Sequence, residues 1–229
     1  MLEAQNICKT FHDRWGYKSF SALDHVSLKV EKGETLGLMG PSGCGKSTLA
    51  RILLRLIYED SGRVLFGEED ISSLRGRKLR PFRQRVQLIS QRPESFFDPS
   101  MKLGESVIEP LKIFHIYEKE SAARMLSEAL EQVKLNDSLL ERYPHQVSGG
   151  EIQRLSICRA LLLNPEVLVL DEATSMLDVS VQAQILHILK ELQRLKKLSY
   201  LFISHDRAVV EWMCDRVAQM EQGKITTCE

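Results

Sequence analysis

The segment from Gly40 to Thr48 matches the phosphate-loop pattern G-x-x-x-x-G-K-[ST]. Its glycines allow consecutive backbone N–H groups to surround a triphosphate, and the N-terminus of a following helix adds the positive end of its dipole. In this pattern Lys46 is placed for the β- and γ-phosphates, and the Ser47 hydroxyl is placed for Mg²⁺. The residues predicted to bind a nucleoside triphosphate here are Gly40, Pro41, Ser42, Gly43, Cys44, Gly45, Lys46, Ser47 and Thr48.

Two adjacent carboxylates follow the apolar run from Val167 to Leu170. A buried strand that ends in two acids is suited to phosphoryl chemistry, because Asp171 can hold Mg²⁺ and Glu172 can orient or deprotonate a water molecule. A strand that ends in a solvated acidic turn would have the same local sequence. The phosphate loop elsewhere in the chain favours the catalytic interpretation.

A second glycine pair precedes a predicted helix, in the segment Val147–Glu151. Ser148, Gly149 and Gly150 could form another anion cradle, with the serine hydroxyl bonded to a γ-phosphate. Ser148 could equally do no more than cap the helix, and the local sequence leaves both interpretations open. One nucleotide cannot easily meet two cradles so far apart in one chain, which suggests a second subunit.

The elements expected to position these groups give an α/β nucleotide-binding core with a helical insertion. Residues 1–39 alternate between apolar and polar types, which predicts antiparallel strands with a turn at residues 31–34. Periodicity and apolar runs predict further strands at 64–66, 86–90, 167–170 and 201–203, helices at 49–57, 121–133, 151–163 and 179–197, and a closing hairpin over 216–227.

Composition excludes several classes of protein. Lys plus Arg and Asp plus Glu each number 31, so a nucleic-acid surface is not expected, and the basic cluster over 75–85 is interpreted as a solvated helix face. No uncharged apolar stretch approaches the ~20 residues of a membrane span, and the first residues lack a signal-peptide pattern. The five cysteines are scattered and no histidine pair has ligand spacing, which predicts a reducing compartment without disulfides or a Cys/His metal site.

Taken together, these motifs resemble those of the ATP-binding subunits of ABC transporters, over essentially the whole chain. Gly40–Thr48 is similar to the Walker A motif, Val147–Glu151 to the signature motif and Val167–Glu172 to Walker B. Gln91 corresponds to the Q-loop glutamine, residues 175–178 to the D-loop and His205 to the switch histidine. The resemblance implies a P-loop NTPase fold of the ABC nucleotide-binding type as one domain over 1–229. An antiparallel β subdomain is expected at 1–39 and a helical subdomain at about 93–150.

The resemblance also implies a mechanism. Two such domains would enclose two ATP molecules head to tail, each nucleotide lying between one chain's Walker A motif and the other's signature. The implied catalytic residues are Glu172 as general base, His205 at the γ-phosphate and Gln91 as a sensor of Mg²⁺. The implied remaining contacts come from Ser47, Gln91 and Asp171 to Mg²⁺, from Ser148, Gly149, Gly150 and Asp178 across the dimer, and from Phe11 to adenine, with Trp15, Tyr17 and Phe20 as neighbouring candidates.

The implied partners are integral membrane permease subunits, a second and similar ATPase chain, and indirectly a substrate-binding protein, at the cytoplasmic face of the membrane. Segments 95–99, 143–146 and 178–184 resemble importers of peptides, nickel or metal chelates, and the end at Glu229 favours the nickel or metallophore branch. Glu151, Ala173 and Met176 depart from the family's usual residues, but none replaces a catalytic side chain.

Two other functions would also use an ATP-binding cassette. A soluble ABC-type ATPase acting on nucleic acid or ribosomes usually has two cassettes or a coiled-coil insertion, which this sequence lacks. A regulatory cassette that binds ATP without turnover would not need Glu172 and His205.

Overall fold

The structure is a computed structural model that describes residues 1–13 and 19–228. The strands are β1 (Leu2–His12), β2 (Ser19–Val30), β3 (Thr35–Met39), β4 (Ser61–Phe66), β5 (Glu69–Asp70), β6 (Val86–Ser90), β7 (Val167–Asp171), β8 (Ser199–Ile203), β9 (Arg216–Glu221) and β10 (Lys224–Cys228). The α-helices are α1 (Lys46–Leu53), α2 (Arg80–Arg85), α3 (Leu103–Ile113), α4 (Lys119–Gln132), α5 (Gly149–Leu161), α6 (Val179–Lys196) and α7 (Arg207–Met213). Short 3₁₀ turns are η1 (Gly76–Leu79), η2 (Pro93–Phe96), η3 (Asp137–Glu141) and η4 (Pro144–Gln146).

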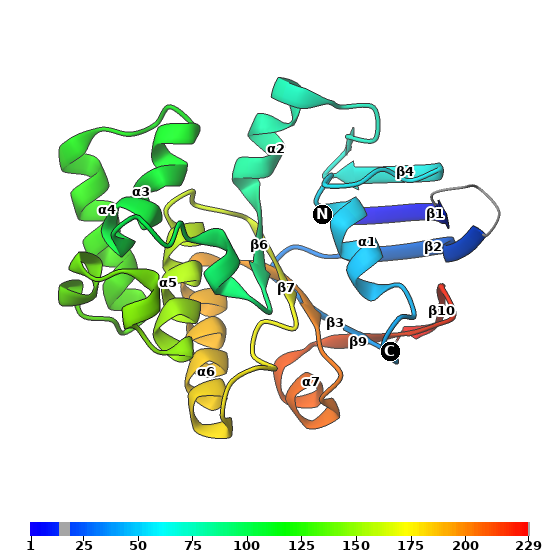
Figure 1. Cartoon of the computed structure of the whole chain (residues 1–229). Coiled ribbons are helices and arrows are strands. Elements are labelled where there is room, and N and C mark those ends of the chain that lie inside the picture. Colours follow the sequence, from blue (N-terminus) through cyan, green and yellow to red (C-terminus); the bar gives the residue numbers. More distant parts are fainter. Residues whose placement is uncertain (14–18, 229) are drawn as a thin grey trace.

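A four-stranded antiparallel sheet, in the order β2-β1-β4-β5, carries the N-terminal part of the chain (Figure 1). Over the last six residues of β2, from His25 to Val30, exposed positions alternate with buried ones, as the sequence predicts. The register pairs Leu2 with Val30 on one side and with Phe66 on the other. The apolar face of this sheet is buried in a cluster that also includes residues of α1.

The second sheet has six strands in the order β10-β9-β3-β8-β7-β6. β9, β3, β8, β7 and β6 run parallel, and β10 forms the predicted hairpin with β9. The prediction that antiparallel strands extend to residue 39 is wrong for Thr35–Met39, because β3 pairs in parallel with β8 and β9. Four of its five residues are buried without alternation, which is typical of a strand covered on both faces.

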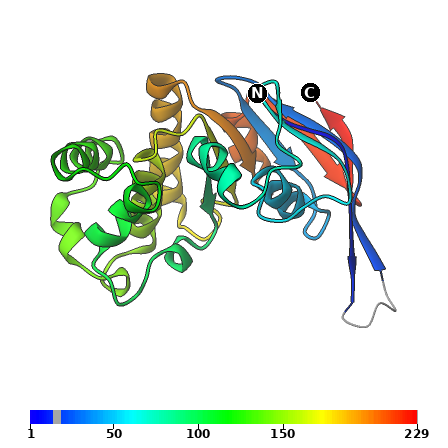
Figure 2. The ribbon, with the colours of Figure 1, turned by 90° about the horizontal axis from the view of Figure 1, so that it is seen from above.

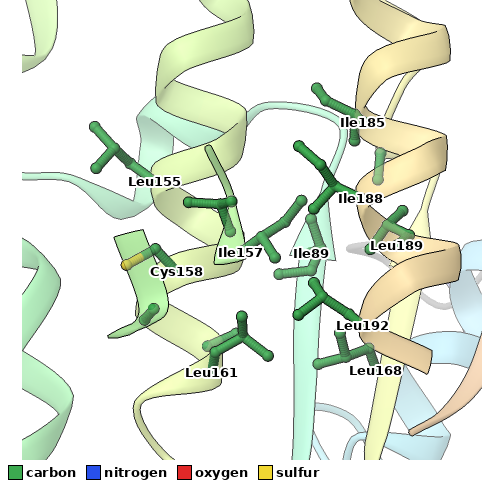
Figure 3. Packing of buried hydrophobic residues seen from close by; sticks show 14 of the residues in the cluster. Ile89, Leu155, Ile157, Cys158, Leu161, Leu168, Ile185, Ile188, Leu189 and Leu192 are labelled. Atoms are coloured by element: carbon green, nitrogen blue, oxygen red, sulfur yellow. The ribbon is translucent and has the colours of Figure 1, made fainter. Parts of the chain in front are cut away.

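The parallel strands β7 and β8 lie at the centre of the molecule, and every residue of β8 is buried. Helices α5 and α6 cover this part of the sheet. Figure 3 shows Ile157 of α5 beside Ile89 of β6, and Leu192 of α6 beside Leu168 of β7. This packing fixes the position of β7, the strand that ends in Asp171.

The segment between β6 and β7 is largely helical. Figures 1 and 2 show α3 and α4 at the end of the molecule opposite β1 and β2. The periodicity of the sequence indicates α4 and α5 within a few residues, but it does not indicate α3. Pro110 lies inside α3 and lacks the N–H that an interior helical position uses, which weakens the helical signal of this segment.

One ion pair is buried beneath the end of α1. The Arg55 side chain is fully buried and donates to Glu59 and to the backbone carbonyl of Ser72, while its Nε has no partner. Because this guanidinium is shielded from water, the carboxylate of Glu59 is the group that compensates its charge.

We therefore expect Glu59→Ala to lower the free energy of unfolding by about 3–5 kcal/mol, because it leaves the Arg55 charge buried and uncompensated. Urea denaturation measures the loss. The matched control is Glu211→Ala, which breaks the exposed i,i+4 pair with Arg207 and should cost less than about 1 kcal/mol. Equal losses in the two variants would contradict the assignment.

Candidate active site

The carboxyl ends of four neighbouring parallel strands meet at one edge of the six-stranded sheet. The phosphate loop (Gly40–Thr48) follows β3, Gln91 follows β6, Glu172 follows β7, and His205 follows β8 with one residue between. Ligands of open α/β sheets bind at this edge, because parallel strands present the loops after them on the same side. The fold thus brings together predicted residues that lie far apart in the sequence.

The phosphate loop ends at the N-terminus of α1. Gly45 is the residue before the helix and has φ +113°, and a Cβ there would lie 2.5 Å from the Ala22 carbonyl oxygen. Glycine is therefore needed for both its backbone angle and its closeness to β2. The helix begins at Lys46, earlier than the predicted Leu49, so the Lys-Ser-Thr end of the motif forms its first turn.

Lys46 lies against its own loop. Its ammonium donates to the carbonyl oxygens of Gly40 at 2.7 Å and Pro41 at 2.9 Å, and the residue is 6% exposed. These bonds hold the ammonium group at the opening of the loop, where it can exchange the carbonyl oxygens for phosphate oxygens.

Ser47 and Asp171 connect the loop with β7. The Ser47 hydroxyl donates to Asp171 Oδ1 at 3.2 Å. Burial raises the pKa of Asp171 above its ordinary value, and the hydrogen bond from Ser47 opposes part of that shift. A hydroxyl beside a carboxylate is an all-oxygen donor pair of the kind that Mg²⁺ prefers.

The raised pKa of Asp171 has a consequence for stability. Because the folded chain holds this proton more tightly than the unfolded chain, stability falls as pH rises through the ordinary carboxyl pKa towards the raised one. We expect Asp171→Asn to raise the melting temperature of the nucleotide-free chain at pH 8, and the gain to shrink as pH approaches about 4. Thermal denaturation at several pH values measures it.

Asp178→Asn is the control, and its expected change in melting temperature has the opposite sign. The backbone N–H of Val181 lowers the pKa of Asp178, so its carboxylate stabilises the fold above its ordinary pKa, and that contribution is lost as pH falls through the lowered value. This variant should melt at a lower temperature at pH 8. A lower melting temperature for Asp171→Asn at pH 8 would contradict the assigned direction.

Glu172 and His205 face each other at the sheet edge. His205 Nδ1 lies 3.7 Å from Glu172 Oε1, and the two side chains are 64% and 24% exposed. Glu172 has φ +50°, an uncommon conformation for a residue with a side chain, and its N–H donates to the Ile203 carbonyl. Such backbone strain is concentrated at functional sites. A carboxylate next to an exposed imidazole can accept a proton from a water molecule placed between β7 and β8.

Gln91 reaches the same centre indirectly. Its Nε2 donates to Ser175 Oγ at 3.2 Å, and Ser175 Oγ donates to the carbonyl oxygen of Glu172 at 3.0 Å. Sequence reasoning placed Ser175 in the D-loop but gave it no role. Its hydroxyl connects the loop after β6 with the backbone of the strained glutamate.

Ser148 begins α5 in a reciprocal capping box with Glu151. The Glu151 carboxylate accepts from the N–H and hydroxyl of Ser148, both at 2.7 Å, and these bonds lower its pKa. Glu151 is thus accommodated as a capping residue. A Cβ on Gly150 would lie 2.5 Å from Val181 Cγ1, so glycine also permits the contact between α5 and α6.

Asp178 caps α6 by accepting from the N–H of Val181 at 3.0 Å. Within this chain, Ser148 and Asp178 therefore serve local helix caps. Both are exposed, and no described contact joins either residue to the phosphate loop.

Two candidate aromatic residues lie opposite each other, Phe11 on β1 and Phe20 on β2. A pocket of about 260 Å³ beside the phosphate loop is lined by Phe20, with Pro41–Cys44, Ser21 and Gly223, and Phe11 is not part of its lining. Phe20 is 60% exposed and Phe11 is 42% exposed. The other candidates, Trp15 and Tyr17, lie outside the described residues.

A larger cavity, of about 740 Å³, lies elsewhere, against α6 and Asp215. The residues at the sheet edge instead open onto the surface, where Ser42, Gly43 and His205 are exposed. Such exposure is typical of a site that two subunits share.

Comparison with known proteins decides the family. The family model described as "ABC transporter" matches residues 23–175, which include the phosphate loop, Gln91 and the two acids at the end of β7, Asp171 and Glu172. This chain belongs to the ABC transporter family. Its mixed α/β architecture is that of the ABC nucleotide-binding domain.

Two curated relatives of this ABC transporter chain are named as ATP-binding proteins, one of a peptide transporter and one of glutathione import. It is 46% identical, over 204 residues, to the "probable peptide ABC transporter ATP-binding protein y4tS" of Sinorhizobium fredii, covering 89% of this chain and 58% of that one. It is 47% identical, over 204 residues, to the glutathione import ATP-binding protein GsiA of Salmonella paratyphi A, covering 89% of this chain and 33% of that one. The chain thus spans little more than half of one relative and a third of the other.

Solved ABC cassettes have the same fold. A dimeric structure of MJ0796, a bacterial ABC transporter cassette, superposes with a TM-score of 0.89 at 28% identity, covering all of this chain and 98% of that one. A dimeric post-hydrolysis state of MJ0796 bound to ADP and Pi gives 0.88 at 27% identity, covering all of this chain and 98% of that one.

Proposed function

We propose that this chain is the ATP-hydrolysing subunit of an ABC importer for peptides or peptide-like solutes. The observation that carries the proposal is the convergence, at one sheet edge, of Lys46, the Ser47–Asp171 pair and the strained Glu172 beside His205. These groups supply a phosphate cradle, oxygen ligands for a divalent cation and a base, which are the parts that phosphoryl transfer to water requires.

The residues fit ATP and Mg²⁺. Gly45 leaves room where a Cβ would collide, and Ser47 with Asp171 would hold the ion. Mg²⁺ bound there supplies charge neutralisation for the phosphates. Phe20 stacks on adenine in preference to Phe11, because it lines the pocket beside the loop.

Glu172 acts as the base that takes the proton of the attacking water, and His205 orients that water and the γ-phosphate. Their separation of 3.7 Å lets both contact one water molecule. Gln91 reports on the site through Ser175, whose hydroxyl bonds to the backbone of Glu172. This connection couples occupancy of the site to the helices between β6 and β7.

A second nucleotide-binding subunit completes the site. Ser148 and Gly149 are exposed at the start of α5, and Gly150 follows them as a buried residue of its first turn. This segment meets the nucleotide of the opposite subunit, as does Asp178. The dimeric MJ0796 cassettes support this arrangement. Our preferred pair is this chain with a similar but different one.

The solute and the membrane partners follow from the importer assignment. The names of the relatives, a peptide transporter protein and a glutathione import protein, favour a peptide-like solute. They give no support to the nickel or metallophore preference, or to an ATPase that acts on nucleic acid. Because importer ATP-binding subunits work with membrane proteins, we assign translocation to permease subunits that this chain contacts from the cytoplasmic face. Among the described residues, no helix is both long and apolar enough to cross a membrane.

The permease contact is placed on the segment after Gln91. Phe96 is 46% exposed there, whereas Phe97 is buried beneath the Arg159 guanidinium. Only the first of the two phenylalanines is therefore available to a partner.

Reconstitution tests the function. The chain, with its permease subunits and binding protein in lipid vesicles, should take up a labelled dipeptide or tripeptide only when Mg-ATP is supplied. A labelled nickel chelate serves as the competing solute. Uptake of the chelate alone would overturn the solute class, and a complete assembly without ATP hydrolysis would overturn the function.

A further inference from the structure

Three side chains of metal-binding type meet on the antiparallel sheet, and none of them belongs to the phosphate loop. They are Cys8 on β1 with Asp24 and His25 on β2, and one potential ligand atom from each lies within 4.8 Å of the others. Cys8 and Asp24 are half-buried and His25 is exposed. A surface pocket of about 410 Å³, lined by Asp24, His25, Ser27, Lys224 and Ile225, opens beside them.

A bulge in the sheet brings these side chains together. Ile7 pairs with Val26 but Lys9 pairs with Leu23, so one residue of β1 opposes two residues of β2. The two are Asp24 and His25, which in a regular strand would point to opposite faces. His25 adopts φ +52°, and this left-handed residue turns its side chain towards that of Asp24.

Hydrogen bonds hold the three groups in place. The N–H of His25 donates to Cys8 Sγ at 3.3 Å, and His25 Nδ1 lies 2.6 Å from Asp24 Oδ1. Lys224 Nζ lies 3.0 Å from the other carboxylate oxygen, Asp24 Oδ2. Oδ1 is therefore able to bind a cation while Oδ2 keeps its lysine, an arrangement typical of a ligand oriented by a second partner.

We propose that Cys8, Asp24 and His25 form a binding site for a zinc-class divalent transition-metal ion. Thiolate, imidazole and carboxylate are the ligands that Zn²⁺ takes in proteins, with bonds of about 2.0–2.3 Å. Tetrahedral binding requires His25 Nδ1 and Asp24 Oδ1 to separate to roughly 3.3 Å, and the exposed His25 ring is free to move that far. A water molecule takes the fourth position from the solvent side.

The site differs in chemistry from the one at Asp171. A thiolate selects softer ions and disfavours Mg²⁺, whereas Ser47 and Asp171 offer only oxygen. The proposal departs from the sequence-based prediction of no Cys/His metal site. That prediction rested on motif spacing, whereas these ligands come from two strands and have no such spacing.

Cobalt(II) titration of the nucleotide-free full chain, with excess Mg²⁺ to occupy oxygen-only sites, tests the proposal. The wild type should develop a thiolate-to-cobalt charge-transfer band that Zn²⁺ abolishes. Cys8→Ser should lose the band. His25→Ala should weaken Zn²⁺ binding by at least about tenfold, because loss of a group that only supports a ligand already costs that much. Cys228→Ser, which removes an exposed cysteine outside the cluster, should keep the band.

A second measurement guards against misfolding. Zn²⁺ should raise the melting temperature of the wild type and of Cys228→Ser, because an ion that binds only the folded chain stabilises it. It should not raise that of Cys8→Ser, whose circular dichroism without metal should match the wild type. A wild type without the band, or a Cys8→Ser variant that retains it, would overturn the proposal.

Discussion

Glu172→Gln is expected to reduce ATP hydrolysis by about 10²–10⁴-fold, the usual contribution of a positioned general base. The amide keeps the shape of the glutamate but cannot accept the proton of the attacking water. Nothing in the phosphate loop changes, since Glu172 makes no described contact with Lys46 or Ser47. ATP binding should therefore persist, and the chain with its partner should accumulate as an ATP-bound dimer.

Single-turnover phosphate release measures the chemical step, and size-exclusion chromatography with ATP measures the dimer. The control is Glu211→Gln on α7, an exposed glutamate paired with Arg207, which should behave as wild type in both measurements. Wild-type turnover by Glu172→Gln would refute the assigned base. Loss of turnover together with loss of ATP binding would instead indicate a damaged loop.

The elements that sequence reasoning found are those whose signals are local. The continuous apolar run over Val167–Leu170 predicts a buried parallel strand, and β7 is one. The apolar positions of α6 repeat at helical spacing, and its observed end at Lys196 lies next to the predicted one. Local patterns also indicated the hairpin between β9 and β10, because a turn-forming Gln-Gly pair separates its strands.

What the sequence could not supply depends on pairing between distant segments. β3 looks like a continuation of the N-terminal strands until its parallel partners β8 and β9 are known. The order of strands at the sheet edge has the same origin, so the Ser47–Asp171 and Glu172–His205 contacts needed the fold. Motif and strand patterns supplied Ser47, Asp171 and Glu172 themselves, whereas His205 came from the resemblance to a family.

The aromatic candidates show the same limit at the scale of one strand pair. Phe11 occupies the position expected from the motif, but Phe20 lies directly opposite it and lines the pocket beside the loop. The register that places Phe20 opposite Phe11 cannot be counted from the sequence, because the two strands are bulged against each other.

Lys46→Ala is expected to weaken ATP binding by about 10–100-fold, because a charge-assisted hydrogen bond contributes about 1.5–3 kcal/mol. Hydrolysis at subsaturating ATP should fall by at least as much. In the described structure the ammonium bonds to the carbonyl oxygens of Gly40 and Pro41, so binding exchanges two neutral acceptors for anionic phosphate oxygens. The net gain comes from that exchange of acceptors.

Because Lys46 also bonds to the backbone of its own loop, Lys46→Ala should lower the free energy of unfolding of the nucleotide-free chain as well. Equilibrium binding of a fluorescent ATP analogue and urea denaturation separate the two effects. Lys46→Arg keeps a positive charge beside the loop carbonyls, but its guanidinium is a planar fork and not a compact ammonium, so it should recover stability better than affinity. Lys32→Ala, at an exposed lysine in the turn before β3, is the neutral control. Unchanged ATP affinity in Lys46→Ala would mean that the backbone N–H groups of the loop and the dipole of α1 suffice to bind the phosphates.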